Sequence, residues 1–421
     1  MIYVNKTLDL DFDNIDIDPF WNVGNEREHK NHRIHAYPAK FPAFITQKAL
    51  EYARQEEIDV KQIVDIFCGC GTVAFEAKRN GIDFWGCDIN PVAVLIAKAK
   101  SHSYKIEKIE KYYEEILSFF DNNKDIYEVP SKINERIRYW FFEPTIKELS
   151  LLKHAILETI PESSKYRFFY LCAFSNILKP TSKWLTKSIK PQLDPQKEPT
   201  EVRDAFVKQC SFMKNAIKDL NFKKNSKVII QKSNALKTKK EQFADLIITS
   251  PPYVTSYEYA DLHQLSSLWL DFADDYRTLR KDSVGSNYNV SNIVELKNNL
   301  FPVGRKIVDK LEEVDKSKAD AVAKYFYDMQ QAASVCYRLL HDKGAALMVI
   351  GNTEYKGVKI NNAKHLVESL YQAGFKSVFI TKRKITNKIL TPYRDKAGKF
   401  SSDENNRKVY SEEFIVVGRK E

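Results

Sequence analysis

The most constraining feature of this sequence is a repeated pairing of a short apolar segment with an amphipathic one, toward both ends of the chain. Residues 62–67 (QIVDIF) and 83–88 (DFWGCD) are typical of buried strands, and residues 72–80 and 91–99 predict helices after them. Further segments repeat this alternation, with strands at 227–231, 245–249, 345–350, 377–382 and 413–418 and helices at about 260–272, 319–341 and 362–373. Such alternation predicts an α/β fold with a mostly parallel, doubly wound sheet, and the last two strands predict an antiparallel hairpin at one edge.

The middle of the chain has a different pattern. Apolar residues recur there at helical spacing, as in Ile106, Ile109, Tyr113 and Ile116, and residues 166–178 are apolar nearly all round, as in a buried helix. We therefore divide the chain into an N-terminal part of the α/β domain (1–100), a helical insertion (101–225) and a C-terminal part of the α/β domain (226–421).

Composition narrows the class of protein. With 421 residues and 43% hydrophobic residues, the chain can bury a core, and no apolar run is long enough for a transmembrane helix. The acidic N-terminus lacks the apolar stretch of a secretory signal, which predicts a cytoplasmic protein. The net charge of +10 suits a polyanionic partner, although many basic proteins bind no nucleic acid. The six cysteines have neither disulfide nor zinc-site spacing, so no metal is predicted.

A glycine-containing turn lies between the first predicted strand and its helix, in DIFCGCGT from Asp65 to Thr72. Gly69 and Gly71 allow a tight turn and close approach of a ligand, and the following helix start offers unpaired N–H groups. The turn is neither the dinucleotide fingerprint, since Ala74 stands where a third glycine would be, nor a P-loop, since no GKS or GKT follows. A purely structural turn that packs the helix onto the strand also fits.

Asp88 ends the second predicted strand, in GCDINP. A carboxylate at this place can accept hydrogen bonds from both hydroxyls of a ribose. It can also cap the helix that begins near Pro91, and the two roles are compatible. Together with the turn at Gly69, Asp88 predicts a cofactor that contains a nucleoside.

The most specific motif is TSPPY, from Thr249 to Tyr253, directly after the strand ADLIIT. Two prolines end the strand and fix the backbone, so that Ser250 and nearby carbonyls face the cleft at the carboxyl end of the sheet. Tyr253 adds a flat aromatic surface. The alternative is a Pro-Pro turn with an incidental tyrosine.

These motifs resemble those of the DNA amino-methyltransferases that use S-adenosyl-L-methionine and have an SPPY-type motif. The resemblance implies a class I methyltransferase, Rossmann-like fold with a seven-stranded sheet. The order of the motifs, with the cofactor motif first and SPPY after a long insertion, implies that the helical insertion 101–225 is the DNA target-recognition region. Segment 35–42 (HAYPAKFP) is similar to the N-terminal motif that covers the methionine end of the cofactor, and segment 231–235 to the part that reaches the adenine. The implied cofactor-binding residues are Tyr37, Pro38, Lys40, Phe41, Asp65, Phe67, Gly69, Gly71, Thr72, Asp88, Ile89, Asn234 and Ala235.

The same resemblance implies methyl transfer to an exocyclic amine of a base flipped out of double-stranded DNA, with Ser250, Pro251, Pro252 and Tyr253 as catalytic residues. Ser before Pro-Pro-Tyr favours cytosine N4 over adenine N6. Cytosine C5 chemistry is excluded because it needs a cysteine nucleophile, usually in a Pro-Cys pair that this chain lacks. An RNA methyltransferase and a non-catalytic nucleic-acid-binding protein remain alternatives. The implied setting is a restriction-modification system, with a companion endonuclease as a genetic partner and association with the nucleoid through DNA.

Residues 176–192 form a basic segment without acidic residues, which we interpret as a phosphate-binding segment, with a solvated basic loop as the alternative. The DNA-binding residues that we expect there are Lys179, Lys183, Trp184, Lys187 and Lys190. Tyr257 and Tyr259 are candidates for pocket walls, with plain packing aromatics as the alternative. Arg383, Lys384, Lys388 and Arg394 are candidates for a stretch near DNA, with a solvated edge loop as the alternative.

Overall fold

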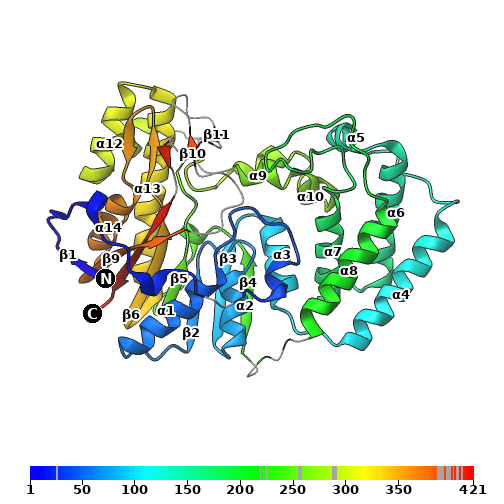
Figure 1. Ribbon diagram of the computed structural model, residues 1–421, viewed down its shortest axis with the longest axis horizontal. Coiled ribbons are helices and arrows are strands. Elements are labelled where there is room, and N and C mark those ends of the chain that lie inside the picture. Colours follow the sequence, from blue (N-terminus) through cyan, green and yellow to red (C-terminus); the bar gives the residue numbers. More distant parts are fainter. Residues whose placement is uncertain are drawn as a thin grey trace.

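The computed structural model describes residues 1–24, 27–218, 220, 222, 226–254, 258–286, 292–385, 393–394, 400–401, 403, 407–408 and 411–421. Figure 1 shows two parts side by side, a sheet flanked by helices and a separate group of helices. Both described chain ends lie at the outer side of the sheet part, away from the group of helices.

Within the described residues, eight strands form the main sheet in the order β1-β9-β13-β6-β5-β2-β3-β4. Their bounds are β1 Ile2–Val4, β2 Gln62–Asp65, β3 Asp83–Asp88, β4 Val228–Lys232, β5 Ala244–Thr249, β6 Leu340–Ile350, β9 Ser377–Lys384 and β13 Glu412–Arg419. The neighbours from β4 to β6 pair in parallel, and β13 is antiparallel to both β6 and β9. This arrangement confirms the predicted mostly parallel, doubly wound sheet.

Two details of the sheet differ from the prediction. The sheet has an eighth strand, because β1 pairs with β9 through Ile2, Tyr3 and Val4. The predicted antiparallel pair of terminal strands exists, but it is not an edge hairpin: β13 lies between β6 and β9. Val416 and the rest of β13 therefore bond to a neighbour on each side, which explains the apolar sequence of this strand.

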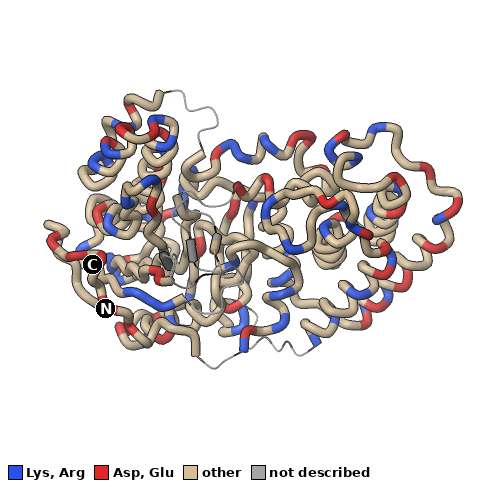
Figure 2. The backbone as a smooth tube through the Cα atoms, turned by 45° about the horizontal axis from the view of Figure 1, so that its top comes forward, with Lys and Arg blue, Asp and Glu red and all other residues tan. Residues whose placement is uncertain are grey.

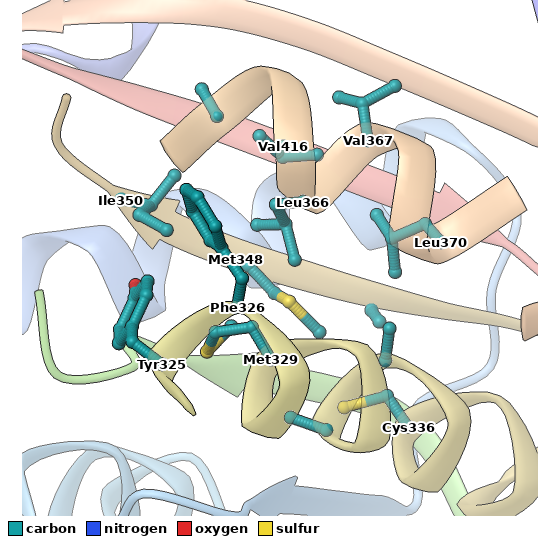
Figure 3. Packing of buried hydrophobic residues seen from close by; sticks show 14 of the residues in the cluster. Tyr325, Phe326, Met329, Cys336, Met348, Ile350, Leu366, Val367, Leu370 and Val416 are labelled. Atoms are coloured by element: carbon teal, nitrogen blue, oxygen red, sulfur yellow. The ribbon is translucent and has the colours of Figure 1, made fainter. Parts of the chain in front are cut away.

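Helices cover both faces of the sheet. One face packs against α1 (Ala43–Gln55), α2 (Thr72–Arg79) and α3 (Pro91–Ser101), and the other against α11 (Ile293–Asn298), α12 (Pro302–Glu312), α13 (Lys316–Leu339) and α14 (Asn362–Ala373). In Figure 3, Phe326 and Met329 of α13 and Leu366 of α14 pack against Met348 of β6. Smaller strands are β7 (Thr353–Tyr355), β8 (Val358–Ile360), β10 (Tyr393–Arg394), β11 (Phe400–Ser401) and β12 (Arg407–Lys408).

The group of helices has a core of its own. It contains α4 (Ile106–Asn123), α5 (Glu135–Trp140), α6 (Glu143–Thr159), α7 (Lys165–Ile177) and α8 (Val202–Lys218), so the predicted helical character of this stretch is confirmed. Its core also includes Val92 and Ile96 of α3 and Trp269 of α10 (Gln264–Trp269). One side of α3 therefore packs on the sheet and the other on the helices, which ties the two parts together.

The tie is reinforced by the buried Gln264, in the segment that follows TSPPY. Its Oε1 accepts hydrogen bonds from Trp140 Nε1 (2.9 Å) and from Arg136 Nε (3.0 Å), both on α5. Trp140 is buried as well, so its N–H depends on this acceptor.

Replacement of Gln264 by Leu removes the acceptor and leaves the Trp140 N–H buried without a partner. We expect the free energy of unfolding to fall by about 1–3 kcal/mol. Urea unfolding followed by circular dichroism measures this. The same substitution at Gln196, which is exposed, serves as a control and is expected to change stability by less than about 0.5 kcal/mol. Equal effects at the two positions would contradict the role of Gln264.

Candidate active site

Four neighbouring strands end at the same edge of the sheet, and the chemically suggestive residues follow these ends. β2 ends at Asp65, β3 at Asp88, β5 at Thr249 and β6 at Ile350. Because parallel neighbours place their carboxyl ends together, the glycine-containing turn and the Ser-Pro-Pro-Tyr segment lie beside each other.

A hydrogen bond joins the two motifs directly. Thr249 Oγ1 donates to Asp65 Oδ1 at 2.6 Å, and the same oxygen accepts from the Phe67 N–H at 3.0 Å. Both Thr249 and Asp65 are buried. Burial raises the pKa of Asp65 to about 7, with these hydrogen bonds opposing the shift.

The two glycines of the turn have different roles. Gly71 has φ of +74°, and a Cβ there would come within 2.6 Å of the Ala97 Cβ, so Gly71 lets α2 pack against α3. Gly69 has φ of +49°, while a Cβ there would meet nothing closer than 3.9 Å. Gly71 is therefore required for the packing of the helix, as in a purely structural turn. Gly69 is not required for packing and shapes the surface of the turn.

Asp88 is fixed by backbone donors. Its Oδ2 accepts from the Gly69 N–H and its Oδ1 from the Asn90 N–H, both at 2.8 Å. The lone pairs that these bonds leave unused can accept further hydrogen bonds, such as those of a hydroxyl group. The cap of α3 is Asn90, whose side chain accepts from the Val92 N–H; Asp88 does not cap this helix. Ile89, between them, is half-buried.

The predicted N-terminal motif reaches the turn through Tyr37. Its ring stacks on His263 (centroids 4.9 Å apart, planes at 24°) and lies nearly parallel to Tyr259 (6.1 Å, 19°). A Cβ at Gly69 would lie 3.9 Å from the Phe67 carbonyl oxygen and 3.9 Å from the Tyr37 side chain. Tyr37, Gly69 and Tyr259 are thus brought together, and the role of Tyr259 as a pocket wall stays a prediction.

The other predicted residues of this motif have different contacts. Lys40 Nζ forms an ion pair with Glu28 (2.5 Å) and donates to the His32 carbonyl. Its contacts are therefore with residues that lie shortly before it in the N-terminal segment. Phe41 packs on the core that contains α1, and Pro38 is half-buried.

Four predicted cofactor residues lie in or next to the turn, or next to β4. Thr72 is the buried first residue of α2. Phe67 packs partly against the sheet core. Asn234 caps the short helix Ala235–Lys237, with its Oδ1 accepting from the Leu236 N–H, and Ala235 is buried. The Asn234 amide nitrogen is not used by this cap.

Ser250 has a defined orientation. Its hydroxyl donates to the Val349 carbonyl of β6 at 3.1 Å and lies beside the Tyr253 hydroxyl, so Oγ keeps a lone pair that can accept a further hydrogen bond. Pro251 is buried and Pro252 is half-buried. The Tyr253 hydroxyl donates to Glu413 Oε1 at 3.0 Å. The site therefore presents hydrogen-bond acceptors beside an aromatic ring.

Two of the predicted residues in the basic segment 176–192 are partly or fully covered: Trp184 is buried and Lys179 is half-buried. Trp184 is 2% exposed and stacks on Trp140, with ring centroids 5.1 Å apart. Lys179 donates to the Ser188 carbonyl at 2.7 Å, and burial lowers its pKa. These contacts give Trp184 and Lys179 a packing role within the segment.

The remaining lysines of this segment are more accessible. Lys183 is half-buried, with Nζ 5.1 Å from the Phe142 ring, while Lys187 and Lys190 are exposed. Figure 2 shows both signs of charge spread over both parts of the molecule, so the net charge of +10 is not gathered in one half.

The other candidate residues for DNA contact or for a pocket wall differ in their surroundings. Arg383 was expected near DNA, but it is 5% exposed and paired with Glu413. Lys384 is exposed. Tyr257, Lys388 and the Arg394 side chain lie outside the described residues.

The sequence interpretation did not assign His263 or Glu413 to the site. Neither belongs to a motif: His263 follows a short helix, and Glu413 is a charged residue at the start of the last strand. Only the tertiary pairing shows that they contact Tyr37 and Tyr253.

The described residues contain neither a cluster of metal ligands nor a membrane-spanning helix. No three His, Cys, Asp or Glu side chains are close enough there to hold a metal ion. Among the helices that the structure describes, none is long and apolar enough to cross a membrane.

The chain is similar to known DNA methyltransferases. Residues 7–99, which include Tyr37, the turn and Asp88, match the DNA methylase family. The chain is 25% identical to the Type II methyltransferase M.MvaI of Kocuria varians, over 85% of this chain and 84% of that protein. It is 27% identical to the Type II methyltransferase M.BsoBI of Geobacillus stearothermophilus, over 57% of this chain and 53% of that protein.

The raised pKa of Asp65 gives a pH-dependent prediction. The folded protein keeps a proton on Asp65 up to about pH 7, whereas the unfolded chain releases it near pH 4. The wild type should therefore lose stability relative to Asp65→Asn as the pH rises from about 4 to about 7, by at most about 4 kcal/mol, with a constant difference above that. Urea unfolding of the cofactor-free proteins across this range measures the difference.

Asp59→Asn is the matched control, because the Asp59 side chain is 77% exposed. It should leave the pH dependence of unfolding unchanged. A flat difference between the wild type and Asp65→Asn from pH 4 to 7 would show that Asp65 is ionised throughout.

Proposed function

We propose that this chain, which belongs to the DNA amino-methyltransferases and uses S-adenosyl-L-methionine, methylates the exocyclic N4 of cytosine at specific sites in double-stranded DNA. The observation that carries the proposal is the orientation of Ser250 beside the cofactor turn. Its proton is donated to Val349, so that Oγ can accept. The relatives named Type II methyltransferases support a role in restriction-modification, with a companion endonuclease as a genetic partner.

The proposed cofactor contacts follow from the residues around the turn. Asp88 would accept from the ribose hydroxyls, Asn234 would reach the adenine, and Tyr37 would cover the methionine end against Gly69. The cofactor supplies a methyl group on a sulfonium, which is already a strong electrophile. The residues of this chain therefore have to prepare the acceptor amine.

An exocyclic amine is a weak nucleophile because its lone pair is delocalised into the ring. Ser250 Oγ and the Pro251 carbonyl would accept its two N–H hydrogen bonds and bring the nitrogen toward tetrahedral geometry. Preorganised contacts of this kind are worth about 3–4 kcal/mol each in the transition state. After transfer the nitrogen loses one proton to water, so no strong base is required.

The target base must leave the duplex to reach this position, at a cost of a few kcal/mol. Tyr253 would stack on the flipped base. Serine before Pro-Pro-Tyr favours cytosine N4 by resemblance, while adenine N6 would use the same acceptors.

The chemistry is tested by expression in a host that lacks DNA methylation, followed by mass spectrometry of its nucleosides. We expect N4-methylcytosine from the wild type, and a decrease of about 100-fold in kcat for Ser250→Ala with binding of S-adenosylmethionine retained. N6-methyladenine would overturn the choice of base. Methylated RNA alone would overturn the choice of DNA, and cofactor binding without any product would favour a non-catalytic binder.

We also propose that Lys187 and Lys190 contact DNA phosphates, since both are exposed. Their joint replacement by Ala should reduce the slope of log affinity against log salt by about 2, because each phosphate contact contributes about 0.9. Fluorescence anisotropy with an unmethylated duplex measures the slope. Lys61→Ala, at the amino end of β2 with its side chain 81% exposed, should leave it unchanged. A similar loss for Lys61→Ala would indicate a purely general charge effect.

A further inference from the structure

The Tyr253 ring is fixed at its hydroxyl by the last strand of the sheet. Its Oη donates to Glu413 Oε1 at 3.0 Å, and Glu413 is in β13, far from Tyr253 in sequence. Burial, reinforced by the nearby Glu413 carboxylate, raises the pKa of Tyr253 well above its usual value. The hydroxyl therefore stays protonated and acts as the donor.

Glu413 is itself held in place. Its cross-strand partner is Arg383 of β9, whose Nη2 lies 2.5 Å from Glu413 Oε2. The Arg383 side chain is 5% exposed, and its guanidinium lies 5.5 Å from the centre of the Phe44 ring on α1. Each Glu413 oxygen thus has its own donor, so the carboxylate has one orientation.

One edge of the Tyr253 ring is in close contact with Gly351, which follows β6. A Cβ at Gly351 would lie 3.0 Å from Tyr253 Cε2 and 3.4 Å from Cδ2. The Gly351 φ is not in the left-handed region, so its backbone would tolerate a side chain. A glycine at position 351 is therefore required by the close contact with the Tyr253 ring and not by the backbone conformation of the turn.

We propose that Glu413, Arg383 and Gly351 are positioning residues that set the plane of Tyr253 for the target base. This inference rests on the proposed function, because it concerns the ring that would stack on that base. None of the three touches the reacting amine in this account. They act through Tyr253, and a displaced ring lowers the fraction of bound bases in a reactive geometry.

The first test is a double-mutant cycle between Tyr253→Phe and Glu413→Ala. The substrate is genomic DNA from a host without methylation, and the readout is kcat/KM for DNA. We expect each single variant to lose about tenfold, which corresponds to one hydrogen bond to a charged group. The double variant should lose no more than Tyr253→Phe alone, because Glu413 acts only through the hydroxyl.

Glu413→Gln separates positioning from folding. It keeps an acceptor for Tyr253, so it should recover most of the activity lost in Glu413→Ala. Binding of S-adenosylmethionine, measured by calorimetry, should stay within about twofold of the wild type in every variant. Independent, multiplicative losses in the cycle would overturn the proposal.

The second test is Gly351→Ala, with Gly24→Ala as the matched control. The added methyl group at Gly351 requires the Tyr253 ring to move by a few tenths of an ångström, whereas a Cβ at Gly24 meets nothing within 4 Å. We expect a loss of about fivefold or more in kcat/KM for DNA at Gly351 and none at Gly24. Unchanged activity in Gly351→Ala would overturn the role of Gly351.

The wild type is measured first, because its activity separates a failure of the proposed function from a failure of the positioning role. If the wild type leaves the DNA unmethylated, the proposed function fails before any variant is compared. If the wild type methylates DNA but Glu413→Ala and Gly351→Ala match it, only the positioning role fails.

Discussion

The candidate site depends on one buried hydrogen bond, from Thr249 to Asp65. These residues are 184 positions apart, and their pairing sets the end of β5 against the end of β2. The turn at Gly69 continues from Asp65, and Ser250 follows Thr249. The relative position of the proposed cofactor contacts and the proposed acceptors is therefore fixed by a contact between two strand ends. Rigid strand ends are suited to hold two reactants in one geometry.

The group of helices is connected to this site through structure and not only through the chain. α3 contributes to both cores, and Gln264 joins α5 to the segment after TSPPY. Trp140, which bonds to Gln264, also stacks on Trp184 at the base of the basic segment. Lys187 and Lys190 thus extend from a segment anchored to the part of the chain that carries His263 and Tyr259. The buried contacts of Trp140 with Trp184 and Gln264 therefore connect the surface that would contact DNA with the surface that would contact the cofactor.

Helices α1, α11 and α12 were not predicted. The sequence was sufficient for the central strands, for α2, α3, α13 and α14, and for the meeting of the motifs. Their apolar patterns are strong because these elements are buried on one or both faces. It was insufficient for β1, in which Ile2 and Tyr3 remain exposed and only Val4 is buried. It also placed the terminal strands at an edge, because no local pattern distinguishes an edge strand from one that is paired on both sides. Trp184 shows the same limit: a tryptophan among lysines suggested a contact surface, yet its ring is in the interior.

The long separation between β2 and β5 has a consequence for how the protein folds. Parallel pairing of these strands closes a loop that contains the whole group of helices, and a loop of that length costs conformational entropy before any contact repays it. Helices α4 to α8 follow one another in the sequence and share one core, so they can become compact first. Their compaction shortens the effective span between the two strands. The inserted helices would then act as an internal folding aid, so that the central sheet closes late and around a region that is already ordered.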